Sequence, residues 1–286
     1  MPYTVNASLE QFYNEINLGG DHRELANTRR NSIVALLQSR LTVVDSFTSG
    51  SIPKFTALKG YADLDIIVQL HWKKHIEGKT CTEVLAEVRA ALAGKSNSVR
   101  RNGQAVTLKY TAWPDVDVVP VARVDDASGN LDHYLVPNSN DNIWIRSRPK
   151  KLATEIEQAA SKCGPGFRKA IKMMKEWNRT HSKYLQSYHI EVMALKSMTS
   201  TLDSDFTWVL FTFFQSAHEL SASSLWYELG FADDYLSMLD RIEARKRLQA
   251  AMDLARDAWY ANRYNNHEQA IKAYKQLFGE RFPAYG

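Results

Sequence analysis

The stretch 49-SGSIPKFTALKGYADLDIIVQL-70 ends as an apolar strand that carries two carboxylates, Asp63 and Asp65. Successive side chains of a strand point to opposite faces, so these two share one face while Leu64 turns toward the core. Carboxylates crowded on one face repel each other unless a cation lies between them. Because Mg²⁺ takes carboxylate and phosphate oxygens together, the pair predicts half of a metal site that works on a phosphate compound.

A second strand supplies a third carboxylate. The segment 113-WPDVDVVPV-121 alternates acidic and apolar residues and places Asp117 before an apolar pair. If this strand neighbours the first one, Asp63, Asp65 and Asp117 surround a pair of metal ions. Two metals bridged by three carboxylates suit an in-line attack on a nucleoside triphosphate. Upstream, the turn at Gly50 and Ser51 can present backbone N–H groups and a hydroxyl to an anion.

The pattern of expected elements changes near residue 150. Before it, helical segments alternate with about five strands, including a hairpin that turns at Asn102-Gly103. A further hairpin is expected around Asp125 to Asn130, with His133 to Val136 as its return strand. After it, residues up to Gly279 show helical periodicity with few strand signals. We therefore predict an α+β protein. Its core lobe spans residues 1–149 and contains a small mixed sheet. A helical lobe over residues 150–286 is expected to close over the nucleotide.

Composition narrows the class of protein further. The chain has 286 residues, 44% of them hydrophobic, and a net charge of +4 with dispersed basic residues. These values suit a globular protein that binds a triphosphate, and they favour neither a long nucleic-acid track nor a membrane span. The first residues do not read as an export signal, so a cytoplasmic location is expected.

The motifs together resemble a known family. Gly50-Ser51, Asp63-Leu64-Asp65 and the distant Asp117 resemble the polymerase-β-type nucleotidyltransferase superfamily. More narrowly, VDVVP, SYH and LFGERFP resemble the bacterial CD-NTases, relatives of cyclic GMP-AMP synthase that act in CBASS anti-phage signalling. The resemblance covers nearly the whole chain. It implies a polymerase-β-like nucleotidyltransferase core, joined to the C-terminal helical lobe.

The resemblance also implies an activity. NTPs (ATP and/or GTP, or pyrimidine NTPs) would be condensed into a cyclic di- or trinucleotide that a downstream effector senses. Two Mg²⁺ (or Mn²⁺) ions would be held by Asp63, Asp65 and Asp117, with Asp117 nearest the acceptor hydroxyl. Gly50 and Ser51 would hold the β- and γ-phosphates.

Three residues of the helical lobe join the site by the same resemblance. Lys175 and Ser187 would contact the triphosphate, and Tyr188 would stack on a nucleobase without choosing among bases. Read from the residues alone, Ser187 caps the helix that follows it. Lys172 and Glu191 are expected to face solvent.

One position departs from the family pattern. Many relatives carry glycine before the threonine that stands here as Thr56, whereas this chain carries Phe55. A bulky side chain there is expected to reshape the mouth of the phosphate-binding turn while leaving the metal ligands intact.

The last residues suggest a further partner. Glu280 to Gly286 has no apolar periodicity and is expected to lie exposed and mobile as an extended tail. Some CBASS operons pair the nucleotidyltransferase with a ubiquitin-like conjugating enzyme, which acts on a terminal glycine. Gly286 is therefore a candidate for conjugation.

Two other classes of protein stay open. The first is a template-independent transferase that makes linear oligonucleotides or extends RNA with the same carboxylates. Such an enzyme is expected to carry a basic groove or an added RNA-binding domain. The second is a non-catalytic protein of the same fold that only binds a partner, against which the retention of all three carboxylates argues.

Overall fold

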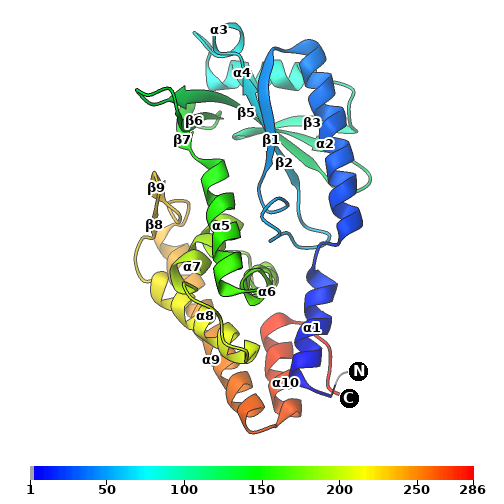
Figure 1. Ribbon diagram of the computed structural model, residues 1–286, viewed down its shortest axis with the longest axis vertical. Helices are drawn as coiled ribbons and strands as arrows, with labels where there is room; N and C mark the ends of the chain where they lie inside the picture. The colour runs from blue at the N-terminus through cyan, green and yellow to red at the C-terminus, as the bar shows by residue number, and fades with distance from the viewer. Residues whose placement is uncertain (1–2) are drawn as a thin grey trace. The chain divides into compact units, whose positions relative to one another are not determined.

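The computed structural model describes residues 3–286, which divide into two units by their internal contacts (Figure 1). The sheet unit comprises Leu18–Phe55 and Gly60–Ala153. The helical unit comprises the residues up to Asn17, the short segment Thr56–Lys59, and Thr154–Gly286. The prediction of domains 1–149 and 150–286 stays a prediction.

Helices and strands are numbered in chain order. The helices are α1 (Val5–Ile16), α2 (Gly20–Arg40), α3 (Trp72–His75), α4 (Cys81–Ala91), α5 (Pro149–Cys163), α6 (Gly166–Thr180), α7 (Ser187–Ser197), α8 (Phe206–Leu220), α9 (Met238–Arg263) and α10 (His267–Phe278). The strands are β1 (Val43–Ser49), β2 (Leu64–Leu70), β3 (Ser98–Asn102), β4 (Ala105–Lys109), β5 (Val116–Asp125), β6 (Leu131–Asn138), β7 (Ile143–Ser147), β8 (Trp226–Tyr227) and β9 (Gly230–Phe231).

The sheet unit is built on one mixed sheet of seven strands. Its main path runs β1-β2-β5-β4-β3, and β6 pairs with both β5 and β7. Strands β2 and β5 are parallel, while the other pairs are antiparallel. The hairpin expected at Asn102-Gly103 is confirmed, since Asn102 pairs with Ala105 across the turn from β3 to β4. The return strand expected at His133 to Val136 is confirmed within β6, which pairs with β5, and β7 is the strand that was not predicted.

Strands β2 and β5 lie at the centre of this sheet because both of their faces are apolar. Ile66 and Val118 are fully buried on one face. Ile67 and Val121 belong to a cluster with Tyr134 on the other. A strand that is buried on both faces reads as a continuous apolar run, as LDIIVQL does. Helices α2 and α4 contact each other, and both pack on strands of the sheet (Figure 1).

The helical unit packs α6 to α10 with α1 and adds the β8–β9 hairpin. Helix α9 contacts α8 and α10, and α6 contacts α1, α7, α8 and α10. An aromatic cluster joins the first and last helices of the unit, with Phe12 of α1 4.8 Å from Phe278 of α10 between ring centroids. This arrangement confirms the predicted fold class: a mixed sheet with C-terminal helices. No helix within residues 3–286 has the length and apolar character that crossing a membrane requires.

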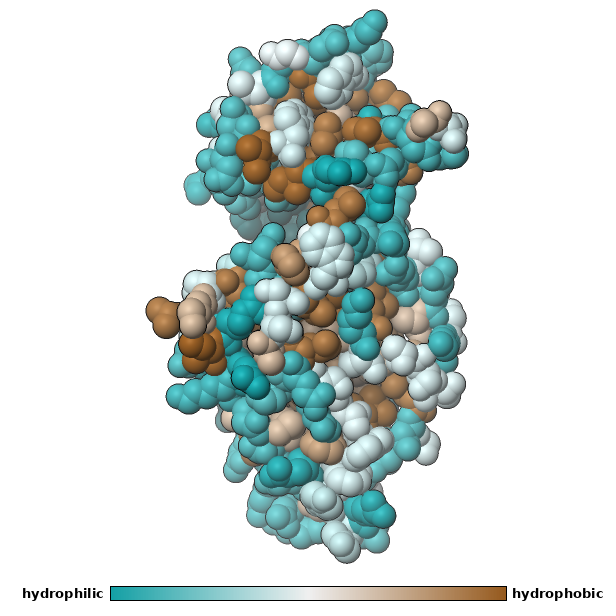
Figure 2. Space-filling model, turned by 90° about the vertical axis from the view of Figure 1, so that its left-hand side faces the viewer, coloured by the Kyte–Doolittle hydropathy of each residue, from teal (hydrophilic) through white to brown (hydrophobic). Residues whose placement is uncertain are grey.

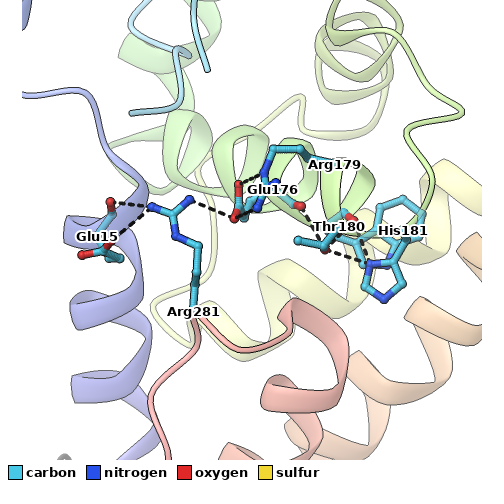
Figure 3. Close-up of polar contacts among 7 residues, drawn as sticks. Glu15, Glu176, Arg179, Thr180, His181 and Arg281 are labelled. Carbon is cyan, nitrogen blue, oxygen red and sulfur yellow. Dashed lines mark hydrogen bonds and ion pairs between the residues drawn. The ribbon is translucent and has the colours of Figure 1, made fainter. Parts of the chain in front are cut away.

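The C-terminal segment is docked rather than exposed as expected. Phe282 is fully buried, and its ring lies 5.2 Å from that of Phe12. Arg281 donates to Glu15 of α1 and, at 3.0 Å, to Glu176 of α6 (Figure 3). Glu176 is completely buried and also accepts two hydrogen bonds from Arg179. The expectation of a freely exposed tail is therefore wrong for Arg281 and Phe282. The sequence around them has no periodic pattern that would have indicated the buried ring or the ion pair.

Hydrophobic side chains also reach the surface of the helical unit. Figure 2 shows hydrophobic residues among hydrophilic ones over the lower half of the face turned to the viewer. Five large apolar residues of β8, β9 and the start of α9 are more than 45% exposed: Trp226, Phe231, Met238, Leu239 and Ile242.

Candidate active site

The pairing of β2 with β5 aligns two of the three predicted carboxylates. In this parallel pair Asp65 lies directly opposite Asp117, between the rungs Leu64–Val116 and Ile66–Val118. Residues in register on neighbouring strands project to the same face of a sheet. The neighbours of Asp65 and Asp117 along each strand are buried, whereas both aspartates are half-buried. The apolar alternation therefore turns the two carboxylates together to one side.

Asp63 extends this row by two residues. It is exposed and lies just before β2, between the buried residues Ala62 and Leu64. The ladder continues to this point, because the backbone N–H of Leu64 donates to the carbonyl oxygen of Asp115 at 2.9 Å. The alternation of burial that holds for Asp65 therefore holds for Asp63 as well.

Gly50 packs directly against Asp65. Strand β1 pairs Ser49 with Asp65, and the chain then turns at Gly50 with a positive φ of 71°. A Cβ atom at Gly50 would lie 1.7 Å from Asp65 Oδ2, closer than any two atoms can approach without a bond. Glycine is therefore required at position 50 for two reasons: the positive backbone angle and the close approach of the Asp65 carboxylate. Ser51 follows at the start of the turn that ends at Phe55.

Two polar residues of β4 complete this face, and the sequence analysis missed both. Thr107 lies opposite Asp117 in the β4–β5 pairing, and its hydroxyl donates to Asp117 Oδ1. Lys109 forms an ion pair with Asp115 at 2.6 Å. That bond raises the pKa of Lys109, and the charges of Asp63 and Asp117 raise it further. The Asn102-Gly103 turn sets only the register of β3 with β4, whereas both contacts depend on the pairing of β4 with β5, for which the sequence carries no local signal.

The donor set fits a hard divalent cation in its chemistry. Carboxylate oxygens are the ligands that Mg²⁺ and Mn²⁺ prefer, and the β2–β5 register sets two of them side by side. Within residues 3–286, no group of three or more His, Cys, Asp or Glu side chains is arranged so that it could hold a metal ion. The strands thus align these carboxylates without drawing them into a closed cluster.

The backbone conformation at Phe55 explains the glycine that the family pattern has at this position. Its φ is 58°, in the left-handed region that favours glycine. The guanidinium of Arg23 lies over its ring, 4.3 Å from the centroid, which offsets part of the strain. The phenyl ring is 41% exposed.

We expect Phe55→Gly to be more stable than Phe55→Ala by about 1 kcal/mol, because alanine retains the unfavourable φ. Both variants lose the ring, so their difference isolates the backbone. Urea denaturation of each variant measures it. Ala90, an exposed position within α4, is the control. There Ala90→Gly is expected to be less stable than the wild-type protein by about 1 kcal/mol, the opposite order of glycine and alanine. A Phe55→Ala protein at least as stable as Phe55→Gly would contradict this explanation.

Lys175 lies in the helical unit, where it is buried and paired. Its Nζ donates to Glu191 Oε1 at 2.7 Å and to Thr56 Oγ1 at 3.1 Å. The Thr56 hydroxyl donates in turn to Glu191 at 2.5 Å. The side chains of Lys175 and Glu191 are 4% and 0% exposed. The expectation that Glu191 faces solvent is therefore wrong, because it balances the charge of a buried lysine.

Lys172 is likewise buried, at 2% exposure, although a solvated face was expected. Its ammonium donates to the side-chain oxygen of Asn17, and it lies 5.3 Å from the centroid of the Tyr13 ring. The packing of α1 against α6 covers this face of the helix. The contact is between segments more than 150 residues apart, so helical periodicity could not indicate it.

Ser187 and Tyr188 begin α7, and both are exposed. The residue at the N-cap is Gln186, which makes no side-chain capping bond, so Ser187 is not the cap that was expected. Tyr188 is 40% exposed, and its ring packs edge-on against Tyr227 at 5.9 Å. Burial raises the pKa of Tyr188 to about 12, with Glu228 as the next cause. Its phenol is therefore neutral at physiological pH.

The chain is similar to known proteins in sequence. A family model described as Second Messenger Oligonucleotide or Dinucleotide Synthetase domain matches residues 3–159. A probable cyclic nucleotide synthase of Bacillus cereus is 22% identical, and the match covers 100% of this chain and 99% of that protein.

Solved structures share the fold across the full length. The Escherichia coli protein CdnC, solved with ATP, superposes with a TM-score of 0.78 at 17% identity, over 99% of this chain and 100% of CdnC. The CD-NTase CdnG of Bradyrhizobium diazoefficiens, solved with GTP, gives a TM-score of 0.74 at 12% identity, over 95% of this chain and 97% of CdnG. At these identities the likeness establishes the fold, and it confirms the resemblance to CD-NTases on which the sequence analysis relied.

Proposed function

The chain belongs to the family of Second Messenger Oligonucleotide or Dinucleotide Synthetase domains, and on that basis we propose that it is a nucleotidyltransferase that condenses NTPs into a cyclic di- or trinucleotide. The relatives solved with ATP and GTP support NTPs as its substrates. The proposal includes Mg²⁺ or Mn²⁺ as the metal and Asp63, Asp65 and Asp117 as the residues that hold it.

One observation carries the proposal: the parallel pairing of β2 and β5, which sets Asp65 beside Asp117 with Gly50 packed against Asp65. A protein that only bound a partner through this fold would have no need of aspartates in register. Nor would it need a glycine whose Cβ space is filled by one of their oxygens. Carboxylate, turn and strand thus form one arrangement that suits a triphosphate and its metal.

The reaction joins two nucleotides and releases pyrophosphate. A ribose hydroxyl oxygen of one nucleotide attacks the α-phosphorus of the other, and the bond from that phosphorus to the β-phosphate oxygen breaks. Bound metal would supply electrostatic stabilisation of the attacking and leaving oxygens. Asp117 is the residue proposed to receive the hydroxyl proton, with the Thr107 hydroxyl fixing one of its oxygens. Gly50 and Ser51 would bind the β- and γ-phosphates.

The helical unit would contribute Ser187 to the phosphates and Tyr188 to the base. Lys175 is also proposed to contact the triphosphate, although in this structure its ammonium is engaged by Glu191 and Thr56. A second transfer within the linear intermediate would close the ring. The product would act as the second messenger of an anti-phage system with a downstream effector. Conjugation of Gly286 stays a prediction.

Product analysis tests the proposal. The purified protein is incubated with each labelled NTP alone and in pairs, with Mg²⁺, and the products are treated with phosphatase and separated. A product whose mobility phosphatase leaves unchanged is expected, because a cyclic oligonucleotide has no terminal phosphate. Linear products, which lose their terminal phosphates to phosphatase and change mobility, would favour the template-independent transferase instead. The absence of any product from all NTPs and pairs would favour a partner-binding protein.

A further inference from the structure

The hydroxyl of Tyr235 bonds to the two residues that bracket Ser187 and Tyr188. The backbone N–H of Gln186 donates to Tyr235 Oη at 2.8 Å, and His189 Nδ1 lies 3.0 Å from the same oxygen. Tyr235 comes from the loop between β9 and α9, more than 45 residues along the chain. One phenol therefore holds both ends of a four-residue segment.

The direction of the first hydrogen bond follows from chemistry. A backbone N–H can only donate, so the Tyr235 oxygen accepts from Gln186. A phenolic oxygen can both donate and accept, so it pairs with His189 Nδ1 in either tautomer of the neutral ring. Burial lowers the pKa of His189 to about 4, so the ring is neutral at physiological pH. Burial likewise raises the pKa of Tyr235 to about 12.

Burial separates the held residues from the presented ones. His189 is 1% exposed, and its ring packs edge-on against Tyr235 with centroids 6.0 Å apart. Ser187 and Tyr188, which lie between the two held positions, are exposed. At Gln186 the N-cap makes no side-chain bond, so the phenol of Tyr235 fixes the start of α7 in place of a usual cap.

The loop that carries Tyr235 is itself anchored. Asp233 is 1% exposed, accepts from the backbone N–H of Leu225 at 2.9 Å, and forms an ion pair with Arg241 of α9. The backbone N–H of Ala232 donates to the Leu225 carbonyl oxygen at 2.8 Å and closes the base of the β8–β9 hairpin. The phenol is thus supported by a buried charge pair.

We propose that Tyr235 is a positioning residue for the nucleotide: through Gln186 and His189 it sets the place of the Ser187 hydroxyl and the Tyr188 ring. This inference rests on the proposed function, in which those two residues contact the substrate. It assigns to the β9–α9 loop a role in substrate affinity without direct contact with the substrate. Pre-set contacts raise affinity because less ordering is left for the binding step.

The test is Tyr235→Phe, which removes the hydroxyl and keeps the ring. We expect the KM for NTP to rise by about 3–10-fold with kcat changed less than about twofold, since uniform binding is lost. The matched control is Tyr274→Phe, because the buried hydroxyl of Tyr274 has no hydrogen-bond partner among residues 3–286. The control is expected to leave KM unchanged. Hydrogen exchange at the Gln186 amide is expected to accelerate in Tyr235→Phe alone.

A double variant excludes a merely structural role. In Tyr235→Phe with Ser187→Ala, the rise in KM is expected to be smaller than the product of the single effects, because both changes act on one contact. Should Tyr235→Phe fold poorly, His189→Leu removes the imidazole that pairs with the Tyr235 hydroxyl and is expected to raise KM by about 2–3-fold.

One result would contradict the positioning role alone, and another would contradict the proposed nucleotide contacts as well. If Ser187→Ala and Tyr188→Ala raise KM while Tyr235→Phe matches Tyr274→Phe, the positioning role is wrong and the proposed function stands. If Ser187→Ala and Tyr188→Ala both leave KM unchanged, the nucleotide contacts themselves are wrong, and the positioning role fails with them.

Discussion

Replacing Asp63 and Asp65 together by asparagine is expected to abolish pyrophosphate release from NTPs, by at least ~10³-fold. Asparagine has nearly the same volume but no charge, so the change removes the ability to hold a divalent cation. Metal stabilisation of the transition state is worth several kcal/mol, and each 1.36 kcal/mol is a tenfold change in rate. The measurement is initial velocity at saturating NTP and Mg²⁺, compared with wild type.

A matched variant separates this effect from a general loss of negative charge. Asp125 lies at the far end of β5 from Asp117, where it forms an exposed pair with Arg123. Asp125→Asn is expected to retain wild-type turnover. Circular dichroism is expected to show the same fold in all three proteins. Turnover by the double variant close to that of wild type would mean that these carboxylates do not perform the chemistry.

The largest expected effect on stability comes from Lys175→Met. This change removes the ammonium that pairs with Glu191 in a site where both side chains are almost fully buried. Breaking a buried ion pair by removing one partner costs about 3–5 kcal/mol, because the remaining charge loses the attraction that offset its desolvation. Urea denaturation is the measurement. Lys272→Met is the control, since the exposed pair with Glu268 contributes only about 0.5 kcal/mol.

Removing both charges is expected to restore most of the stability. In Lys175→Met with Glu191→Leu both charges of the pair are gone, while the Thr56 hydroxyl loses its acceptor and the Thr56 carbonyl oxygen loses its donor. The double variant is therefore expected to be more stable than Lys175→Met alone, by about 2 kcal/mol or more. A double variant that is as unstable as the sum of its single changes would show that the pair is not coupled.

The same double variant tests the proposed contact of Lys175 with the triphosphate. Because it is expected to fold, its NTP affinity can be measured by calorimetry without the complication of unfolding. A lost charge-assisted contact is worth about 1.5–3 kcal/mol, so affinity is expected to fall by about 10-fold or more. Unchanged affinity would assign Lys175 and Glu191 to the core of the helical unit alone.

The comparison of sequence and structure shows which features local patterns determine. Asp65 and Asp117 could be placed together because strand alternation and apolar neighbours fix the face on which each side chain lies. The burial of Lys172, Lys175 and Glu191 could not be predicted, because helical periodicity describes one helix at a time. Their burial depends on α1, on Thr56 and on α7, which are distant in sequence from α6.

The prediction of an exposed C-terminal segment was wrong for a related reason. A single aromatic residue, Phe282, and a single charge, Arg281, fix its position, and neither produces a periodic pattern. At Phe55, by contrast, the sequence indicated an unusual position. The resemblance identified this residue as a departure from glycine, and its positive φ is the physical reason for that glycine.

The most direct test of the central claim is metal-dependent release of pyrophosphate. Wild-type protein is incubated with NTPs in Mg²⁺, in Mn²⁺ and in excess EDTA, and pyrophosphate is measured with nucleotide products in the same samples. The account predicts pyrophosphate and a phosphatase-resistant oligonucleotide with either metal, and neither with EDTA. Equal turnover in EDTA would contradict it.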